Sequence, residues 1–280
     1  MGQSDLSEKS LEFFPDVFAD IINALLYQGE QIVCAENLQA APTETLYKSK
    51  SGNLRNQFHD VSKYDMQDGK IKVQYTLENE TSIKSKTVLR KAGYEGAVYR
   101  EQYDGGNIFP FISVLLYWGK RPWKAPKSLE QLWGQSEVWE QNKKYIDNIQ
   151  LHIYEMTHLP KDVRNRFHSD MRIIVDYLAE KKNYEPTEQK IIHLEAVLQM
   201  LKVLTRDERY EEILPKLQIE EKEKGGVTMC ELLDKYEKRG ENKMAQLIQM
   251  LLGMNRVADL TMAAENEEYR NKLYEEFKII

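Results

Sequence analysis

The sequence predicts an α/β protein with a mixed sheet core flanked by helices, followed by a mainly helical C-terminal region. Three observations predict it. Residues 70–80 alternate between apolar and polar side chains, which is the period of a β-strand. Residues 109–118 form an apolar run typical of a strand inside a covered sheet. Beyond residue 123 the apolar residues follow helical spacing and no strand is expected.

The first element expected is a helix over residues 16–27, in which Phe18, Ile21, Ile22, Leu25 and Leu26 lie on one side. Its other side has a regular spacing as well. Asp16, Asp20 and Asn23 stand at positions i, i+4 and i+7, which places them on one face. That face is turned either to a functional site or to water.

A β-hairpin follows, after a loop over residues 36–53 rich in turn-forming residues. Its strands are residues 58–64 and 70–80, and Asp68-Gly69 is a turn signal between them. If the turn centres on Gly69, Asp60 lies opposite Glu78, whereas a two-residue turn pairs Asp60 with Leu77. Both registers bring Asp60 close to Glu78, but only the first puts the two carboxylates on one face.

A helix over residues 85–103 and a buried strand over 109–118 complete the order helix, strand, strand, helix, strand. This order predicts a crossover helix between strands of one sheet. The later helical periods fall near 136–155, 162–181, 187–204 and 207–214, and Gly225-Gly226 precedes shorter helices. We therefore expect three parts, residues 1–125, 126–224 and 225–280.

Charge, hydropathy and the absence of known motifs exclude some classes of protein. The chain has 280 residues and a net charge of -6, which argues mildly against a protein that coats nucleic acid. The first third is nevertheless locally cationic, which is compatible with contact to a polyanion. The longest apolar run is too short to cross a bilayer, and the N-terminus lacks a signal-peptide pattern, so we expect a cytoplasmic protein without membrane association. No phosphate-binding loop or dinucleotide fingerprint occurs, which argues against a nucleotide cofactor.

Asp60 and the tripeptide Glu78-Asn79-Glu80 are the candidate site. Two carboxylates about one strand spacing apart can bind a hard divalent cation, which activates water and neutralises charge on a scissile phosphate. Taken alone this pattern is weak evidence, because polar residues are common on an exposed strand face.

The chain also resembles the recombination-promoting nuclease/putative transposase family, whose catalytic domain belongs to the PD-(D/E)XK nuclease superfamily. The matching segments are DVFADIINALLYQGEQIV at 16–33, LRNQFHDVSKY at 54–64, YTLENET at 75–81, Arg90 and Tyr94 in the following helix, FPFISVLLYWGKRPWKAPKSL at 109–129 and GGVTMCELLDKYEKRG at 225–240. The resemblance implies a restriction-endonuclease-like core and a DNA endonuclease that uses Mg, Mn or Ca.

Carried over by position, the resemblance implies that Asp60 and Glu78 are metal ligands and that the backbone carbonyl of Asn79 is a third. An acidic residue of the opening helix often contributes in related folds, and Asp16 is the candidate here, with helix capping as its alternative role. Glu80 stands where the family has Gln or Lys, and its negative charge cannot stabilise the attacked phosphate in the same way. Either a nearby lysine substitutes, or Glu80 binds a second metal, or catalysis is impaired. The candidate DNA contacts are Lys63, Lys84, Lys86 and Arg90.

The leading hypothesis is thus a metal-dependent DNA endonuclease linked to recombination or mobile elements, with DNA as its partner and a homodimer as a reasonable assembly for cutting both strands. The rival is a nuclease-fold DNA-binding or interaction protein that has lost catalysis through Glu80. A third interpretation is a helical scaffold with a structural N-terminal domain.

Overall fold

The computed structural model describes residues 11–48, 54–58, 60–105, 107–134 and 136–279. The chain folds as two compact units, divided between Tyr184 and Glu185. This division coincides with neither expected boundary, because the segment that follows residue 125 adds a strand to the sheet of the first unit and packs two helices against its opening helix.

The first unit contains the following elements in chain order: α2 (Pro15–Leu26), η1 (Ala35–Asn37), β1 (Leu38–Ala40), β2 (Glu44–Lys48), β3 (Leu54–Phe58), β4 (Val61–Gln67), β5 (Lys70–Glu80), α3 (Thr87–Gly105), β6 (Phe111–Tyr117), α4 (Leu129–Trp133), α5 (Glu137–Asn142), η2 (Lys143–Tyr145), β7 (His152–Glu155), η3 (Met156–His158), α6 (Lys161–Arg164), α7 (Met171–Glu180) and η4 (Lys181–Asn183). The opening helix, the hairpin, the crossover helix and the buried strand are confirmed.

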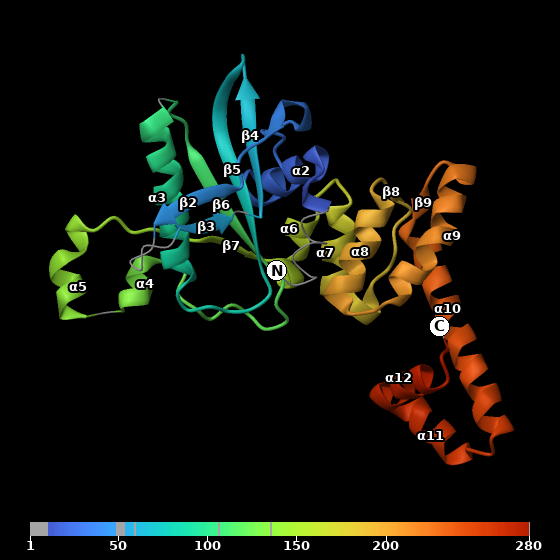
Figure 1. The fold of residues 1–280 in the computed structure, drawn as a ribbon. Helices are drawn as coiled ribbons and strands as arrows, with labels where there is room; N and C mark the ends of the chain where they lie inside the picture. The colour runs from blue at the N-terminus through green and yellow to red at the C-terminus, as the bar shows by residue number, and fades with distance from the viewer. Residues whose placement is uncertain (1–10, 49–53, 59, 106, 135, 280) are drawn as a thin grey trace. The chain divides into compact units, whose positions relative to one another are not determined.

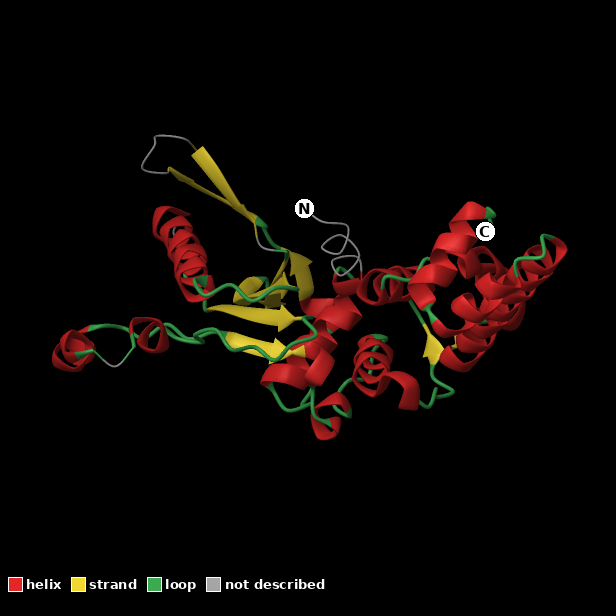
Figure 2. Ribbon diagram, turned by 90° about the horizontal axis from the view of Figure 1, so that it is seen from below, coloured by secondary structure: helices red, strands yellow, loops and turns green. Residues whose placement is uncertain are grey.

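A five-stranded mixed sheet forms the core of this unit, in the order β1-β4-β5-β6-β7. Strands β1, β4 and β5 are antiparallel, while β5, β6 and β7 are parallel. Helix α3 makes the crossover from β5 to β6, as expected. Strands β2 and β3 pair only with each other and form a separate ribbon (Figure 2).

Helices α2 and α3 cover opposite faces of the sheet (Figure 1). On the α2 face the hydroxyl groups of Tyr27 and Tyr75 are 2.7 Å apart, and Tyr154 donates to the carbonyl of Leu25 at 2.8 Å. On the α3 face Glu80 forms ion pairs with residues of α3 and of the loop before it. Since side chains alternate along a strand, odd positions of β5 from Val73 onward face α2 and even positions from Gln74 onward face α3.

Two expectations about strands are wrong. The prediction that no strand follows residue 123 fails because β7 adds parallel to β6 and β8 (Lys190–Ile191) pairs with β9 (Val227–Thr228). These strands have four, two and two residues, too few to show a period in the sequence. The expected loop over 36–53 likewise contains β1 and β2, of which β1 pairs with β4 at the sheet edge.

The polar face of α2 is an internal hydrogen-bonding surface and does not face water. Asn23 is fully buried; its amide donates to the carbonyl of Val33 at 2.8 Å, and its oxygen accepts from the backbone N–H groups of Ile32 and Val33. Asp20 accepts from the backbone N–H groups of His168 and Ser169, just before α7. Asn23 therefore fixes the segment that follows α2, and Asp20 attaches the loop before α7 to α2.

The second unit is helical: α8 (Leu194–Thr205), α9 (Arg209–Lys224), α10 (Met229–Gly253), α11 (Val257–Glu265) and α12 (Glu267–Glu276). Helix α10 begins with a capping box between Thr228 and Glu231 and runs for 25 residues, so the expectation of only short helices after Gly226 is wrong. Its C-terminal part packs with α11 and α12 around Leu247, Leu251 and Ala263.

Replacing Asn23 with Ala should lower the free energy of unfolding of the first unit by about 2 kcal/mol, because the buried N–H and carbonyl of Val33 and the N–H of Ile32 lose their partner. Tryptophan fluorescence during urea unfolding measures this, since every tryptophan of the chain lies between residues 118 and 139. Asn37→Ala, at an exposed position, is the control. An equal urea midpoint for both variants would contradict the role given to Asn23.

Candidate active site

The hairpin places Asp60 beside the C-terminal end of β5. Its turn is the two-residue Asp68-Gly69, with φ of 51° and 73°, which is typical of a tight hairpin turn. A bulge then shifts the register between Asp65 and Met66, so that Val61 pairs with Leu77. The next position, Asp60, therefore lies opposite Glu78. The structure combines features of the two expected registers. The turn has two residues, as in the register that pairs Asp60 with Leu77, but the bulge shifts the pairing so that the carboxylates of Asp60 and Glu78 lie on one side.

The Asp60 carboxylate accepts a hydrogen bond from the backbone of β5. Its Oδ2 accepts from the N–H of Asn79 at 2.6 Å. The N–H and C=O of one strand residue point toward the same neighbouring strand, so the Asn79 carbonyl is directed toward the side on which Asp60 lies. An Asp60 carboxylate and an Asn79 carbonyl thus share one side of the strand.

The Asn79 side chain is held on the other face of the sheet. Its amide donates to Oε2 of Glu12 at 2.9 Å, and its oxygen accepts from Nε1 of Trp118 at 2.7 Å. Glu12 is fully buried. Nothing in the sequence indicated Glu12, since the contact joins residues 67 positions apart. This bonding fixes the strand segment on which Glu78 and Glu80 stand.

Glu78 is 6% exposed and lines a small cavity between β5, β6, β7 and α3. The cavity volume is about 10 Å³, and its polar lining includes Arg90, Tyr94, Ser113 and His152. This is about the space that one water-sized sphere needs. The even positions of β5 from Gln74 to Glu80 are therefore buried although their side chains are polar, whereas Lys70 and Lys72 are exposed.

Glu80 is 4% exposed and is paired with two cations. Nζ of Lys84 lies 3.1 and 2.9 Å from its two carboxylate oxygens, and Arg90 forms an ion pair with Oε1. The negative charge of Glu80, which stands where Gln or Lys is expected, is thus paired with two positive charges, those of Lys84 and Arg90. Both oxygens of Glu80 are already engaged, which disfavours its alternative role as a ligand of a second metal.

Electrostatic effects connect these residues around Tyr94. Burial and then the charge of Glu78 raise the pKa of Tyr94 to about 12; Asp60 and Glu80 add to this rise and Arg90 opposes it. Burial lowers the pKa of Arg90, but Glu80, Tyr94 and Glu78 outweigh that effect and raise it above its ordinary value. The site thus keeps a neutral phenol and a charged guanidinium at neutral pH.

The other expected contributors lie elsewhere. Lys63 is 6% exposed and donates to the carbonyl of Phe13 at 3.0 Å, so it is not placed to contact phosphate. Lys86 is exposed at the start of α3. Asp16 lies in the first turn of α2 and does not line the cavity beside Glu78; the N-cap of α2 is Phe14, so the alternative capping role of Asp16 is wrong.

Across the described residues, no group of three or more His, Cys, Asp or Glu side chains is arranged to hold a metal ion. The expected ligand set is smaller than that, with two carboxylates and one backbone carbonyl. Oxygen donors of this kind suit hard cations such as Mg or Ca. The described part of the chain also contains no helix with the length and apolarity to span a bilayer.

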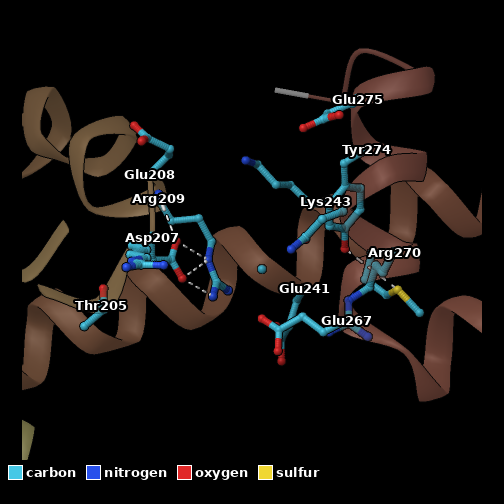
Figure 3. A pocket seen from close by; sticks show the side chains of 14 residues that line it. Thr205, Asp207, Glu208, Arg209, Glu241, Lys243, Glu267, Arg270, Tyr274 and Glu275 are labelled. Atoms are coloured by element: carbon cyan, nitrogen blue, oxygen red, sulfur yellow. Dashed lines mark hydrogen bonds and ion pairs between the residues drawn. The ribbon is translucent and has the colours of Figure 1, made fainter. Parts of the chain in front are cut away.

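The second unit contains a larger cavity, of about 740 Å³, where the start of α9 faces α10 and α12 (Figure 3). Arg209 is held there by Asp207, with Nε 3.0 and 3.1 Å from the two carboxylate oxygens, and lies over the ring of Tyr236. A Cβ at position 240 would come within 2.8 Å of Arg209 Nη1, so Gly240 makes room for the guanidinium. The cavity lining mixes both signs of charge, which does not define an anion or cation site.

Comparison of the chain with protein-family models, with curated proteins and with solved structures gives no match. The candidate site is accordingly defined by its own geometry: the Asp60 carboxylate on the backbone of β5, buried Glu78, and the cations that surround Glu80.

Replacing Glu78 with Gln should lower the pKa of Tyr94 from about 12 toward 10, because it removes a negative charge that opposes ionisation of the phenol. With its pKa raised, Tyr94 contributes stability below pH 10 that is lost as the pH rises from 10 to 12. Carbon NMR of labelled tyrosine follows the titration, and Tyr94→Phe assigns the signal. Glu101→Gln, on the exposed side of α3, is the control. An unchanged Tyr94 titration in Glu78→Gln would show that the two groups are not coupled.

Proposed function

We propose that the chain is a metal-dependent DNA endonuclease of the PD-(D/E)XK class, related to the recombination-promoting nuclease/putative transposase family and linked to recombination or mobile elements. The observation that carries this proposal is the position of the Asp60 carboxylate on the Asn79 backbone, opposite Glu78. A hairpin followed by a crossover helix and a parallel strand also agrees with a restriction-endonuclease-like core.

Asp60, Glu78 and the Asn79 carbonyl would hold the divalent cation, for which Mg is the first choice. A cation bound there supplies charge neutralisation at the scissile phosphate and lowers the pKa of water. Two carboxylates offset most of its charge, and the third carboxylate, Glu80, is already balanced by Arg90 and Lys84.

Arg90 is the residue of this chain that we expect to contact the phosphate. Its side chain is 32% exposed, its guanidinium is held on one side by Glu80, and it lines the cavity beside Glu78. A planar guanidinium suits bidentate contact with phosphate oxygens. Lys84, whose side chain is 57% exposed, adds a second charge next to it. Together they provide positive charge beside the position at which the family has Gln or Lys.

Purified wild type should nick supercoiled plasmid with Mg or Mn and stop with excess chelator, and Asp60→Asn should reduce nicking by about a hundredfold or more, because it removes a ligand charge. Asp104→Asn changes an exposed carboxylate of α3 and should retain activity. Gel quantification of nicked plasmid measures both. Equal nicking by wild type and Asp60→Asn would point to a contaminant or to another site.

Glu80→Gln separates the proposal from its rival, a nuclease-fold binding protein without catalysis. If Glu80 holds Arg90 and Lys84 in place, its loss should lower nicking by about tenfold or more, since misplaced phosphate contacts cost rate. The rival predicts the opposite: an inert wild type and cutting by Glu80→Gln. The same plasmid assay, with Glu101→Gln as the matched control, decides between them.

A further inference from the structure

A cavity lined by aromatic rings lies outside the candidate active site, in the segment between β6 and β7. Its volume is about 490 Å³, and its walls include Trp133, Trp139, Tyr145, Ser136 and Asn142. The ring centroids of Trp133 and Trp139 are 5.5 Å apart and the rings are tilted by 43°, so the two rings contact each other in the cavity wall. Trp133 is 46% and Tyr145 76% exposed, although large aromatic side chains stabilise a fold mainly when they are buried.

Residues 128–150 form a lobe whose two ends are joined by backbone hydrogen bonds. The backbone N–H of Leu129 donates to the carbonyl of Ile149, and that of Leu151 donates to the carbonyl of Lys127. Leu129 and Leu151 then pack in one apolar cluster with Val88, which belongs to α3. The helix that carries Arg90 and Tyr94 therefore also anchors the lobe, which ties the aromatic cavity to the layer of the candidate active site.

Positive charge accompanies the aromatic walls. Lys144 lies next to Tyr145, with its Nζ 4.8 Å from the ring centroid. The strap that leads from β6 into the lobe, residues 119–127, contains four basic and no acidic residues, in a chain of net charge -6. Lys120, Arg121 and Lys124 of this strap are exposed. The lobe itself carries four acidic residues, Glu130, Glu137, Glu140 and Asp147, and none of them lines the cavity.

We propose that this cavity binds an unpaired nucleobase of a single-stranded DNA segment, while the strap and Lys144 contact the adjoining phosphates. Aromatic rings beside cations are the combination that single-stranded nucleic acid selects, because every base has a π-face and every linkage a charge. An apolar peptide fits less well, since it would gain nothing from the strap. The inference rests on the proposed function and deepens it: the substrate contains a single-stranded region beside the cleavage site.

Tryptophan fluorescence tests this directly, because Trp118, Trp123 and Trp139 are at most 6% exposed and Trp133 is the exposed reporter. An oligothymidine strand, added to the full chain with chelator so that nothing is cut, should quench the fluorescence saturably, and a duplex of equal length should bind more weakly. Tyr145→Ala keeps the reporter and should weaken binding at least about fivefold. Tyr103→Ala, an exposed tyrosine of α3, should not change it. For Trp133→Phe, anisotropy of a labelled strand replaces the lost signal and should show weaker binding.

Equal affinities for wild type and Tyr145→Ala, or for single strand and duplex, would overturn the inference, and so would saturable quenching by a leucine-rich peptide without any by the strand. Plasmid nicking by the same preparations keeps the two proposals apart. Nicking without quenching would contradict the base-binding cavity and support the nuclease proposal. Quenching without nicking would support the base-binding cavity and contradict the nuclease proposal.

Discussion

Burial of β5 on both faces is the constraint on which the first unit depends. From Gln74 to Glu80 all side chains of this strand are buried, although four of the seven are Gln, Glu or Asn. Buried polar groups need partners, and the contacts that supply them come from distant parts of the chain. Gln74 bonds to Ser62, and Asn79 bonds to Glu12 and Trp118. The strand that carries Glu78 and Glu80 is therefore also the strand that fixes the surrounding elements.

The hairpin shows how a local irregularity sets the geometry of the candidate site. A regular hairpin with the Asp68-Gly69 turn would put Asp60 opposite Leu77, whose side chain faces α2. One extra residue in β5, Lys72, moves the pairing by a single step. Because a strand has a period of two, this step is the difference between carboxylates on one face and carboxylates on opposite faces.

Sequence periodicity predicted α2, β5 and α3, since each is long enough to show its period, and a continuous apolar run predicted β6. It did not predict β7, which is a four-residue strand at a sheet edge. Periodicity also could not show which side chains contact one another. The Asp60 and Glu78 pair followed from hairpin geometry, whereas the positions of Glu12 and His152 depend on packing between elements far apart in sequence. The contact of Arg90 with Glu80 depends on how α3 packs on the sheet. The polar residues of α2 were recognised as one face, but their backbone partners were not.

The sheet ends on both sides in very short strands, three residues in β1 and four in β7. An edge of that length offers few free backbone groups to an incoming strand, which is a common protection against edge-to-edge aggregation. It also limits how two copies of the chain can associate. If cutting both strands of DNA requires a homodimer, this five-stranded sheet offers little edge from which to continue across two subunits.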